Sequence, residues 1–199
     1  MTVAAYLKRA GSCACLLSAL VFAQAATALE LAGVKIDESA QVANRDLLLN
    51  GAGIRYKAIF KVYTAALYLP EKKATPADVM NSSGPRRIMI VMLRDVSSED
   101  FGQAFMSGIQ KNSDKAETAK IINQLTKFGE LFASIPELKK GDVLTTDWIP
   151  GTGTLIQING KKAGEVFPDL AFYNALLKIW IGDKPADSKL KLRLLGDVS

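Results

Sequence analysis

The sequence predicts an α+β fold in which a mainly antiparallel β-sheet is packed on one face by helices, as in an open-faced β-sandwich. Segments rich in β-branched and aromatic residues dominate the first half of the chain, as is typical of strands. Amphipathic helical stretches follow, and then a pair of hairpins and further helices. This order of strands, helices, hairpins and helices favours an antiparallel sheet with its helices segregated to one side.

The first half of the chain contains most of the expected strands. Residues 31–36 and 46–49 are predicted to form short strands around a polar turn. Residues 55–69 form either one long bent strand or a tight hairpin. A short helical turn over 75–78 has a threonine cap and a proline at its first position. Residues 86–93 are apolar after the first two and are expected to form a central strand.

Two central helices are predicted from apolar residues at helical spacing. A capping signal at 97–100 opens the first helix, and polar residues at 112–114 break or bend it. The second helix is expected over 115–135, where isoleucine, leucine and phenylalanine form a stripe with a 3.6-residue period.

The last third of the chain is predicted to contain hairpins and two more helices. Strands over 143–149, 154–158 and 163–167 are separated by a Pro-Gly turn and by an Asn-Gly turn, which is a favoured two-residue hairpin signal. A third helix over 169–181 stops at a glycine, and a last short helix is expected over 186–195.

Residues 1–28 are interpreted as a secretory signal peptide. They contain a basic pair, an apolar run and an A-x-A-like cleavage site at 26–28, with cleavage after Ala25 as the alternative. The apolar run is shorter than the ~20 residues of a spanning helix, so we expect no stable membrane anchor after cleavage. We therefore expect one domain over 29–199, located in a bacterial periplasm or secreted.

Cleavage would remove both cysteines of the chain, Cys13 and Cys15, and the chain has no histidine. The remaining protein would have no thiolate nucleophile, no imidazole base, no disulfide and none of the usual nitrogen and sulfur ligands of zinc. We therefore expect no metal and no cofactor. The chemistry left is that of carboxylates, lysine, arginine, tyrosine and hydroxyl side chains, or simple binding.

The charge of the chain argues against nucleic acid as a partner. The net charge is +5, and it falls to +3 when Lys8 and Arg9 are removed. The basic residues are dispersed in pairs such as Lys72–Lys73, whereas nucleic-acid binding requires a concentrated basic face. An incidental attraction to anionic membrane surfaces stays open.

The most informative segment runs from Gly51 to Arg55, at the start of an apolar strand pair. Arginine is a permanent cation whose planar five-donor fork suits a carboxylate. Glycine lets the backbone bend or pass close to another group. The pattern is compatible with a site for an acidic, apolar ligand, and the alternative is an exposed arginine on an edge strand.

Gly51–Arg55, together with Val62–Leu69 and the closing run 172–188, resembles the chalcone isomerase-like superfamily, in particular its bacterial secreted branch. The likeness covers most of residues 30–196. It implies an antiparallel sheet covered on one face by helices. The superfamily includes plant enzymes that close a flavanone ring and non-enzymatic members that bind fatty acids.

The resemblance implies that Arg55 binds the anion of the ligand and that a hydroxyl residue further along supports it. Two alignments place that hydroxyl on Tyr63 or on Thr64, and strand alternation favours Tyr63 on the face of Arg55. The tyrosine and asparagine that face the substrate in the plant enzymes fall on Phe101 and Gly108. Because these residues offer no hydrogen bond to a reacting group, we expect no catalytic residues.

Aromatic residues on the helices, including Phe101 and Phe105, are candidates to line a cavity for an acyl chain, although core packing is the commoner role of such a stripe. We predict a secreted, non-catalytic binding protein for a fatty acid or a similar amphipathic carboxylate. The alternatives are an isomerase or lyase acting on a chalcone-like aromatic ketone, and a structural or interaction protein with a closed pocket. An apolar tunnel beside Arg55 would favour the first, and a filled core with Arg55 paired to an internal carboxylate would favour the last.

Overall fold

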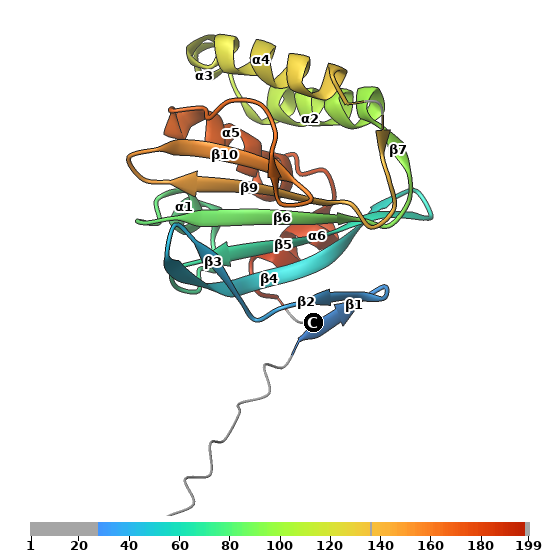
Figure 1. Ribbon diagram of the computed structural model, residues 1–199. Helices are drawn as coiled ribbons and strands as arrows, with labels where there is room; N and C mark the ends of the chain where they lie inside the picture. Colours follow the sequence, from blue (N-terminus) through green and yellow to red (C-terminus); the bar gives the residue numbers. More distant parts are fainter. Residues whose placement is uncertain (1–27, 136, 198–199) are drawn as a thin grey trace, which may run out of the picture.

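The computed structural model describes residues 28–135 and 137–197 (Figure 1). The main sheet consists of seven antiparallel strands: β3 (Ser39–Val42), β4 (Arg45–Lys57), β5 (Phe60–Leu69), β6 (Arg86–Met92), β9 (Val143–Ile149), β10 (Gly153–Ile158) and β11 (Lys161–Lys162). Their order across the sheet is β11-β10-β9-β6-β5-β4-β3. Two small antiparallel pairs lie beside it: the hairpin of β1 (Leu29–Leu31) with β2 (Val34–Ile36), and β7 (Val96–Ser97) with β8 (Glu137–Leu138), which are joined through helices.

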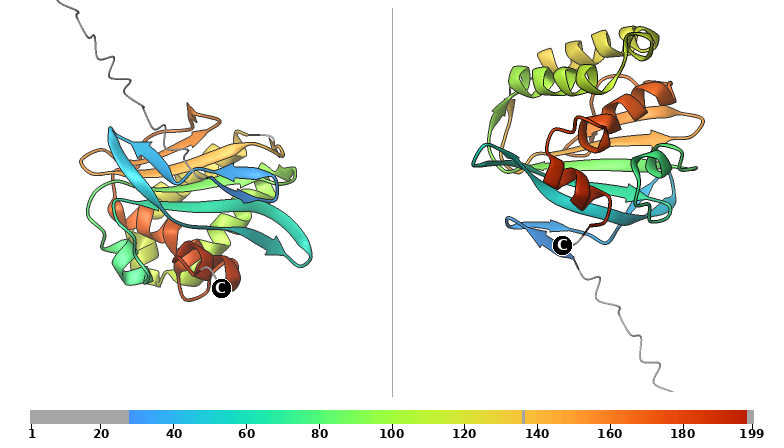
Figure 2. Two further views of the ribbon diagram at one scale, coloured as in Figure 1. Left: turned by 90° about the horizontal axis from the view of Figure 1, so that it is seen from below. Right: turned by 180° about the vertical axis from the view of Figure 1, so that it is seen from behind.

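Six helices occur in the described part of the chain: α1 (Pro76–Met80), α2 (Ser98–Asn112), α3 (Lys115–Lys120), α4 (Ile122–Ala133), α5 (Leu170–Ile181) and α6 (Ser188–Leu194). Helices α2, α5 and α6 lie on one side of the curled sheet, and α4 lies outside α2 (Figure 2). The predicted fold class is therefore confirmed. None of these helices is long and apolar enough to cross a membrane.

Two cores stabilise the sheet, one on each face. The larger core lies between the helices and β5, β6, β9 and β10, and it is built from aromatic and aliphatic side chains. The smaller core lies on the opposite face, where strands β1 to β3 cover apolar side chains of β4 and β5. Side chains alternate between these faces along each strand, so the sheet separates the two cores.

Several predicted boundaries differ from the structure. The segment 31–36 forms two strands instead of one, because the chain turns at Ala32 and Gly33, both with positive φ. The expected strand 163–167 is wrong: the tight Asn-Gly turn places β11 directly opposite the end of β10, and the chain then leaves the sheet. Only Phe167 returns, in an isolated bridge to Thr154.

The helix expected over 115–135 is also wrong as a single element. It is divided into α3 and α4 at Ile121, whose φ of −117° and ψ of 13° are not helical. Asp114 and Glu117 form a reciprocal capping box that starts α3 as a separate helix. The kink keeps Ile121 in the core at 1% exposure, which explains why the apolar stripe continues across the break.

Candidate functional site

Arg55 and Tyr63 lie directly opposite each other on neighbouring strands. The segment 55–69 is a hairpin that turns at Ala58 and Ile59, and its register pairs Arg55 with Tyr63. A register shift follows Arg55, so that Val62 is an extra residue on β5. The two side chains share the helix-covered face through pairing across the hairpin, and not through their spacing along one strand.

The guanidinium of Arg55 lies over the Tyr63 ring, with its Cζ atom 5.4 Å from the ring centroid. The side chain is half-buried, and its Nε atom is buried without a hydrogen-bond partner. Within the described residues the guanidinium makes no ion pair and no hydrogen bond. Arg55 is therefore a partly dehydrated cation that is held by an aromatic face and has its donors free.

The two arginines of β6 have more partners within the chain than Arg55 has, although the Nε atom of Arg86 is also buried without a hydrogen-bond partner. Arg86, at 1% exposure, donates to two carbonyl oxygens at the end of α1 and lies over the Tyr173 ring. Arg87 forms a two-point pair with Asp147, at 2.6 Å for each nitrogen–oxygen contact. Arg55 differs from both in that its guanidinium makes no hydrogen bond within the described residues, which makes it a candidate for binding an external anion.

A carboxylate near this pair, that of Asp187, is committed to backbone amides. Asp187 caps α6 by accepting hydrogen bonds from the amides of Lys189 and Leu190, at 2.9 and 3.1 Å. It also accepts the amide of Tyr56, at 3.0 Å. Sequence reasoning did not single out Asp187, although an aspartate just before an amphipathic run is an N-cap signal.

Tyr63 is bound from the helical side by Trp180, whose Nε1–H donates to the tyrosine hydroxyl over 2.9 Å. Both side chains are almost fully buried. Burial raises the pKa of Tyr63 to about 12, against the opposing influences of Arg55 and of the Trp180 hydrogen bond. Tyr63 is therefore a neutral phenol at physiological pH, able to donate its own proton in a hydrogen bond.

Thr64 points to the opposite side of the sheet. The register between β5 and β6 is unbroken from Tyr63 to Tyr68, so Thr64 shares the face of Ala66 and Tyr68. It is fully buried, and its Oγ1 atom has no hydrogen-bond partner. The structure thus brings Arg55 and Tyr63 together and separates Thr64 from them.

The glycines before Arg55 allow α6 to lie on β4. Gly51 and Gly53 share the face of Arg55, and a Cβ atom on Gly51 would stand 2.0 Å from the carbonyl oxygen of Arg193. A Cβ atom on Gly53 would stand 2.9 Å from the Cβ of Arg193. The close approach expected of these glycines is therefore to a helix of the same chain.

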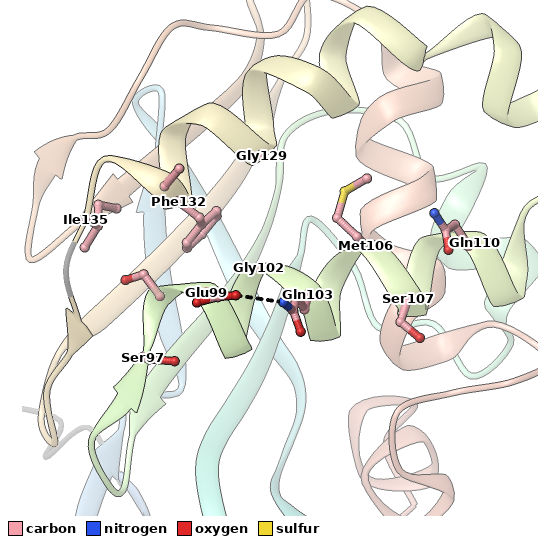
Figure 3. A pocket seen from close by; sticks show the side chains of 12 residues that line it. Ser97, Glu99, Gly102, Gln103, Met106, Ser107, Gln110, Gly129, Phe132 and Ile135 are labelled. Carbon is pink, nitrogen blue, oxygen red and sulfur yellow. Dashed lines mark hydrogen bonds between the residues drawn. The ribbon is translucent and has the colours of Figure 1, made fainter.

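A cavity of about 690 Å³ opens between α2 and α4 (Figure 3). Met106 and Phe132 line it from the two helices, and neither Arg55 nor Tyr63 reaches it. Ser98, 1% exposed, lines it with a hydroxyl that has no hydrogen-bond partner. Sequence reasoning missed this cavity, because the groove is formed by two helices whose relative position no local pattern specifies.

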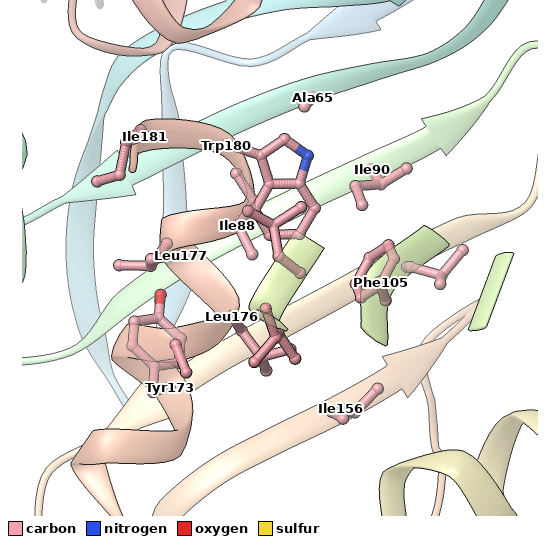
Figure 4. Packing of buried hydrophobic residues seen from close by; sticks show 14 of the residues in the cluster. Ala65, Ile88, Ile90, Phe105, Ile156, Tyr173, Leu176, Leu177, Trp180 and Ile181 are labelled. Atoms are coloured by element: carbon pink, nitrogen blue, oxygen red, sulfur yellow. The ribbon is translucent and has the colours of Figure 1, made fainter. Parts of the chain in front are cut away.

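Phe101 and Phe105 lie in the main core between Arg55 and this cavity. Their exposures are 3% and 6%, and the Phe101 ring is 6.4 Å from that of Tyr63 and 5.4 Å from that of Phe132. Phe105 packs edge-on against Trp180 (Figure 4), with centroids 5.3 Å apart. The aromatic side chains thus form a continuous filled core from Tyr63 to the cavity wall.

Gly108, which stands where the resemblance places the asparagine of the plant enzymes, lies at the contact between α2 and α5. A Cβ atom there would stand 3.0 Å from Ile179 of α5, so an asparagine would require α2 and α5 to separate. Among the described residues, no three or more carboxylate, cysteine or histidine side chains are grouped to hold a metal ion. The arrangement offers binding groups, namely one cation, one phenol and apolar walls.

Comparisons with known proteins agree with this fold. A family model described as chalcone isomerase-like matches residues 28–196. A crystal structure of a fatty-acid binding protein from Arabidopsis thaliana has the same fold, with a TM-score of 0.68 at 17% identity, over 82% of this chain and 92% of that chain. A comparison with curated proteins found no significant match. Because the family model spans most of the sequence, the chain belongs to the chalcone isomerase-like family.

Proposed function

We propose that this protein is a non-catalytic binding protein for a fatty acid or a similar amphipathic carboxylate. The observation that carries the proposal is the guanidinium of Arg55, which has no anionic partner among the described residues and lies at the edge of an apolar core. The solved neighbour with the same fold is a fatty-acid binding protein, which supports binding over catalysis.

The carboxylate of the ligand would be held by Arg55 and Tyr63 together. A guanidinium offers two parallel N–H donors to a carboxylate. The Tyr63 hydroxyl accepts from Trp180, and its own proton is available to the ligand. Because the pKa of Tyr63 is about 12, the phenol keeps that proton and does not repel the anion.

The acyl chain would follow the aromatic side chains from Tyr63 towards the cavity between α2 and α4. Phe101 and Phe132 connect the two places. Since these rings fill the core, binding requires α4 to move outward from α2. Gly102 and Gly129 face the cavity from the two helices, and no atom lies within 4 Å of the position of a Cβ on Gly129.

The filled aromatic core favours a second candidate, a structural or interaction protein with a closed pocket. The state of Arg55 counts against it, because an arginine with a purely structural role is expected to direct its donors to partners within the chain, as Arg86 and Arg87 do. Export through a signal peptide over residues 1–28, to a periplasm or to the outside of the cell, is part of the main proposal. That segment lies outside the described residues.

Calorimetric titration with palmitate tests the proposal. Arg55→Ala should weaken binding by about 2–5 kcal/mol, the scale for breaking a desolvated charge pair. Arg55→Lys should recover part of the affinity, because an ammonium lacks the two-point geometry. Arg45→Ala, at the exposed far end of the same strand, is the matched control and should bind as the wild type does.

Equal affinity of the wild type and Arg55→Ala would overturn the anion site. A loss of thermal stability in Arg55→Ala, with no measurable ligand for the wild type, would support the structural candidate. Native mass spectrometry of the purified protein provides an independent readout, since a carrier is expected to retain a lipid from the expressing cell.

A further inference from the structure

The tip of the β4–β5 hairpin exposes apolar side chains that the fold does not use. Ile59 is 84% exposed, Phe60 56% and Tyr56 42%, and Ile59 is the most exposed of the large apolar residues described. The turn is also locally unfavourable, because Ala58 adopts a φ of 54°, where glycine, asparagine or aspartate is usual. Residues 58–60, with the sequence Ala-Ile-Phe, therefore neither favour this turn nor stabilise the fold by burial.

Cations surround this apolar tip. Arg55, Lys57 and Lys61 lie on the two strands of the hairpin, and the segment from Arg55 to Lys61 contains no carboxylate. Arg94 comes from the neighbouring connection after β6, and its guanidinium lies over the Phe60 ring, 5.3 Å from the centroid. Figure 1 shows both connections at the same end of the sheet.

The carboxylates described close to this end of the sheet include Asp187, Asp95 and Asp142, and all three are engaged; Asp142 accepts the amide of Lys139 and the side-chain amide of Asn159. Asp187 accepts backbone amides, including that of Tyr56. Asp95 accepts the amide of Lys140 and lies 3.7 Å from the Lys139 ammonium. The apolar tip is therefore bordered by Lys57, Lys61 and Arg94, and no carboxylate in the described part of the chain is bound to any of the three.

We propose that this hairpin tip docks the protein on a membrane surface with anionic headgroups. Ile59 and Phe60 would enter the interface between headgroups and acyl chains, while the lysines and Arg94 contact the phosphates. Lysine stems are long enough to lie along the apolar zone with their ammonium groups at the phosphate level. A protein partner or a second copy of the chain would cover the apolar residues equally well, but a ring of cations around them matches an anionic lipid surface best.

The proposed docking on a membrane does not require a bound ligand. A role of docking in the uptake of a fatty acid from the membrane rests on the proposed function. Arg55 lies on the same hairpin, three residues before the turn. Docking would therefore bring the anion-binding cation close to the interface, where a fatty acid exposes its carboxylate. A lipid transferred there would not cross bulk water.

Vesicle sedimentation tests the docking surface. The full chain and its variants are mixed with vesicles of phosphatidylcholine alone and of equal parts phosphatidylcholine and phosphatidylglycerol. We expect binding to the anionic vesicles that declines with added salt. Ile59→Ser with Phe60→Ser should weaken it more than tenfold, and Lys57→Gln and Lys61→Gln about fivefold each. Ile122→Ser, an exposed apolar position on α4, is the matched control and should bind normally.

Equal sedimentation of the wild type and the Ile59→Ser, Phe60→Ser variant would overturn the inference. A second result would also overturn it: analytical ultracentrifugation shows that the wild type is a dimer and this variant a monomer, while both bind vesicles equally. That result would assign the hairpin tip to contact with a second copy of the chain. Palmitate titration separates this proposal from the preceding one. The tip variant should bind palmitate in solution as the wild type does, whereas Arg55→Ala should lose palmitate and keep most of its vesicle binding.

Discussion

At the scale of single residues, the hydrogen bond from Trp180 to Tyr63 joins the helical layer to the strand that faces Arg55. The donor and acceptor are both buried, and they are 117 residues apart in the sequence. A buried hydrogen bond contributes modestly when made, but a buried donor without an acceptor carries its full desolvation cost. Tyr63 therefore contributes to the fold as well as to the proposed site.

Replacement of Tyr63 by phenylalanine should affect both roles. The Trp180 Nε1–H would lose its acceptor, so we expect the free energy of unfolding to fall by about 1–3 kcal/mol while the protein still folds. Palmitate binding should weaken by about 0.5–1.5 kcal/mol, the value of one neutral hydrogen bond. Urea denaturation and calorimetry measure the two effects. Tyr56→Phe, at an exposed position, should change stability by less than about 0.5 kcal/mol, and an equal loss in both variants would contradict the assignment.

At the scale of elements, the packing of α6 on β4 determines where Arg55 stands. Two glycines on one face of β4 remove the side chains that would hold the helix away. Asn50 is an extra residue in the register of β4. Its side-chain amide donates a hydrogen bond to the carbonyl oxygen of Leu194, over 2.7 Å, and so holds the end of the helix. Asp187 fastens the beginning of the helix near Tyr56.

Gly51→Ala should displace α6, because the added methyl group would meet backbone and not a flexible side chain. We expect a loss of at least about 1–3 kcal/mol in the free energy of unfolding, the usual cost of overpacking. Gly129→Ala on α4 is the control, since its methyl group would meet no atom within 4 Å and alanine favours a helix by up to about 1 kcal/mol. Chemical denaturation of both variants gives the comparison, and equal stabilities would show that α6 does not rest on Gly51.

At the scale of the whole molecule, buried phenols make the fold sensitive to alkali. Burial raises the pKa of Tyr63 and of Tyr68 to about 12, from an ordinary value of 10.0, and raises that of Tyr173 further. The folded state therefore favours the protonated phenols. This contribution to stability is complete below pH 10 and is lost as the pH rises through the raised pKa values.

Urea denaturation between pH 8 and 12 should show this loss directly. The raised pKa of Tyr63 corresponds to a contribution on the order of 2–3 kcal/mol to the free energy of unfolding. Tyr63→Phe should therefore be less destabilised by alkali than the wild type, and phenolate absorbance should rise together with unfolding. Complete titration of the buried tyrosines near pH 10 in a folded protein would contradict the prediction.

The fold was more accessible from the sequence than the site. Periodicity identified the strands and helices because burial of one face requires it, but it missed the break at Ile121, where a kink and an apolar stripe coexist. The shared face of Arg55 and Tyr63 was expected from alternation along one strand, and the structure reaches it through a hairpin. Whether Phe101 and Phe105 line a tunnel or fill a core depends on packing that no local pattern encodes, because both roles require the same apolar side chains.

The position of α6 has a consequence for the timing of folding during synthesis. This helix spans Ser188–Leu194, far along the chain from Gly51 and Gly53, which it covers on the strand that carries Arg55. While a ribosome still holds the C-terminal segment, that face of β4 stays uncovered, and contacts between residues so distant in sequence form slowly. The native packing of this face is therefore completed only after α6 has been synthesised and has left the ribosome, so the strand that carries Arg55 is among the last parts of the fold to be covered.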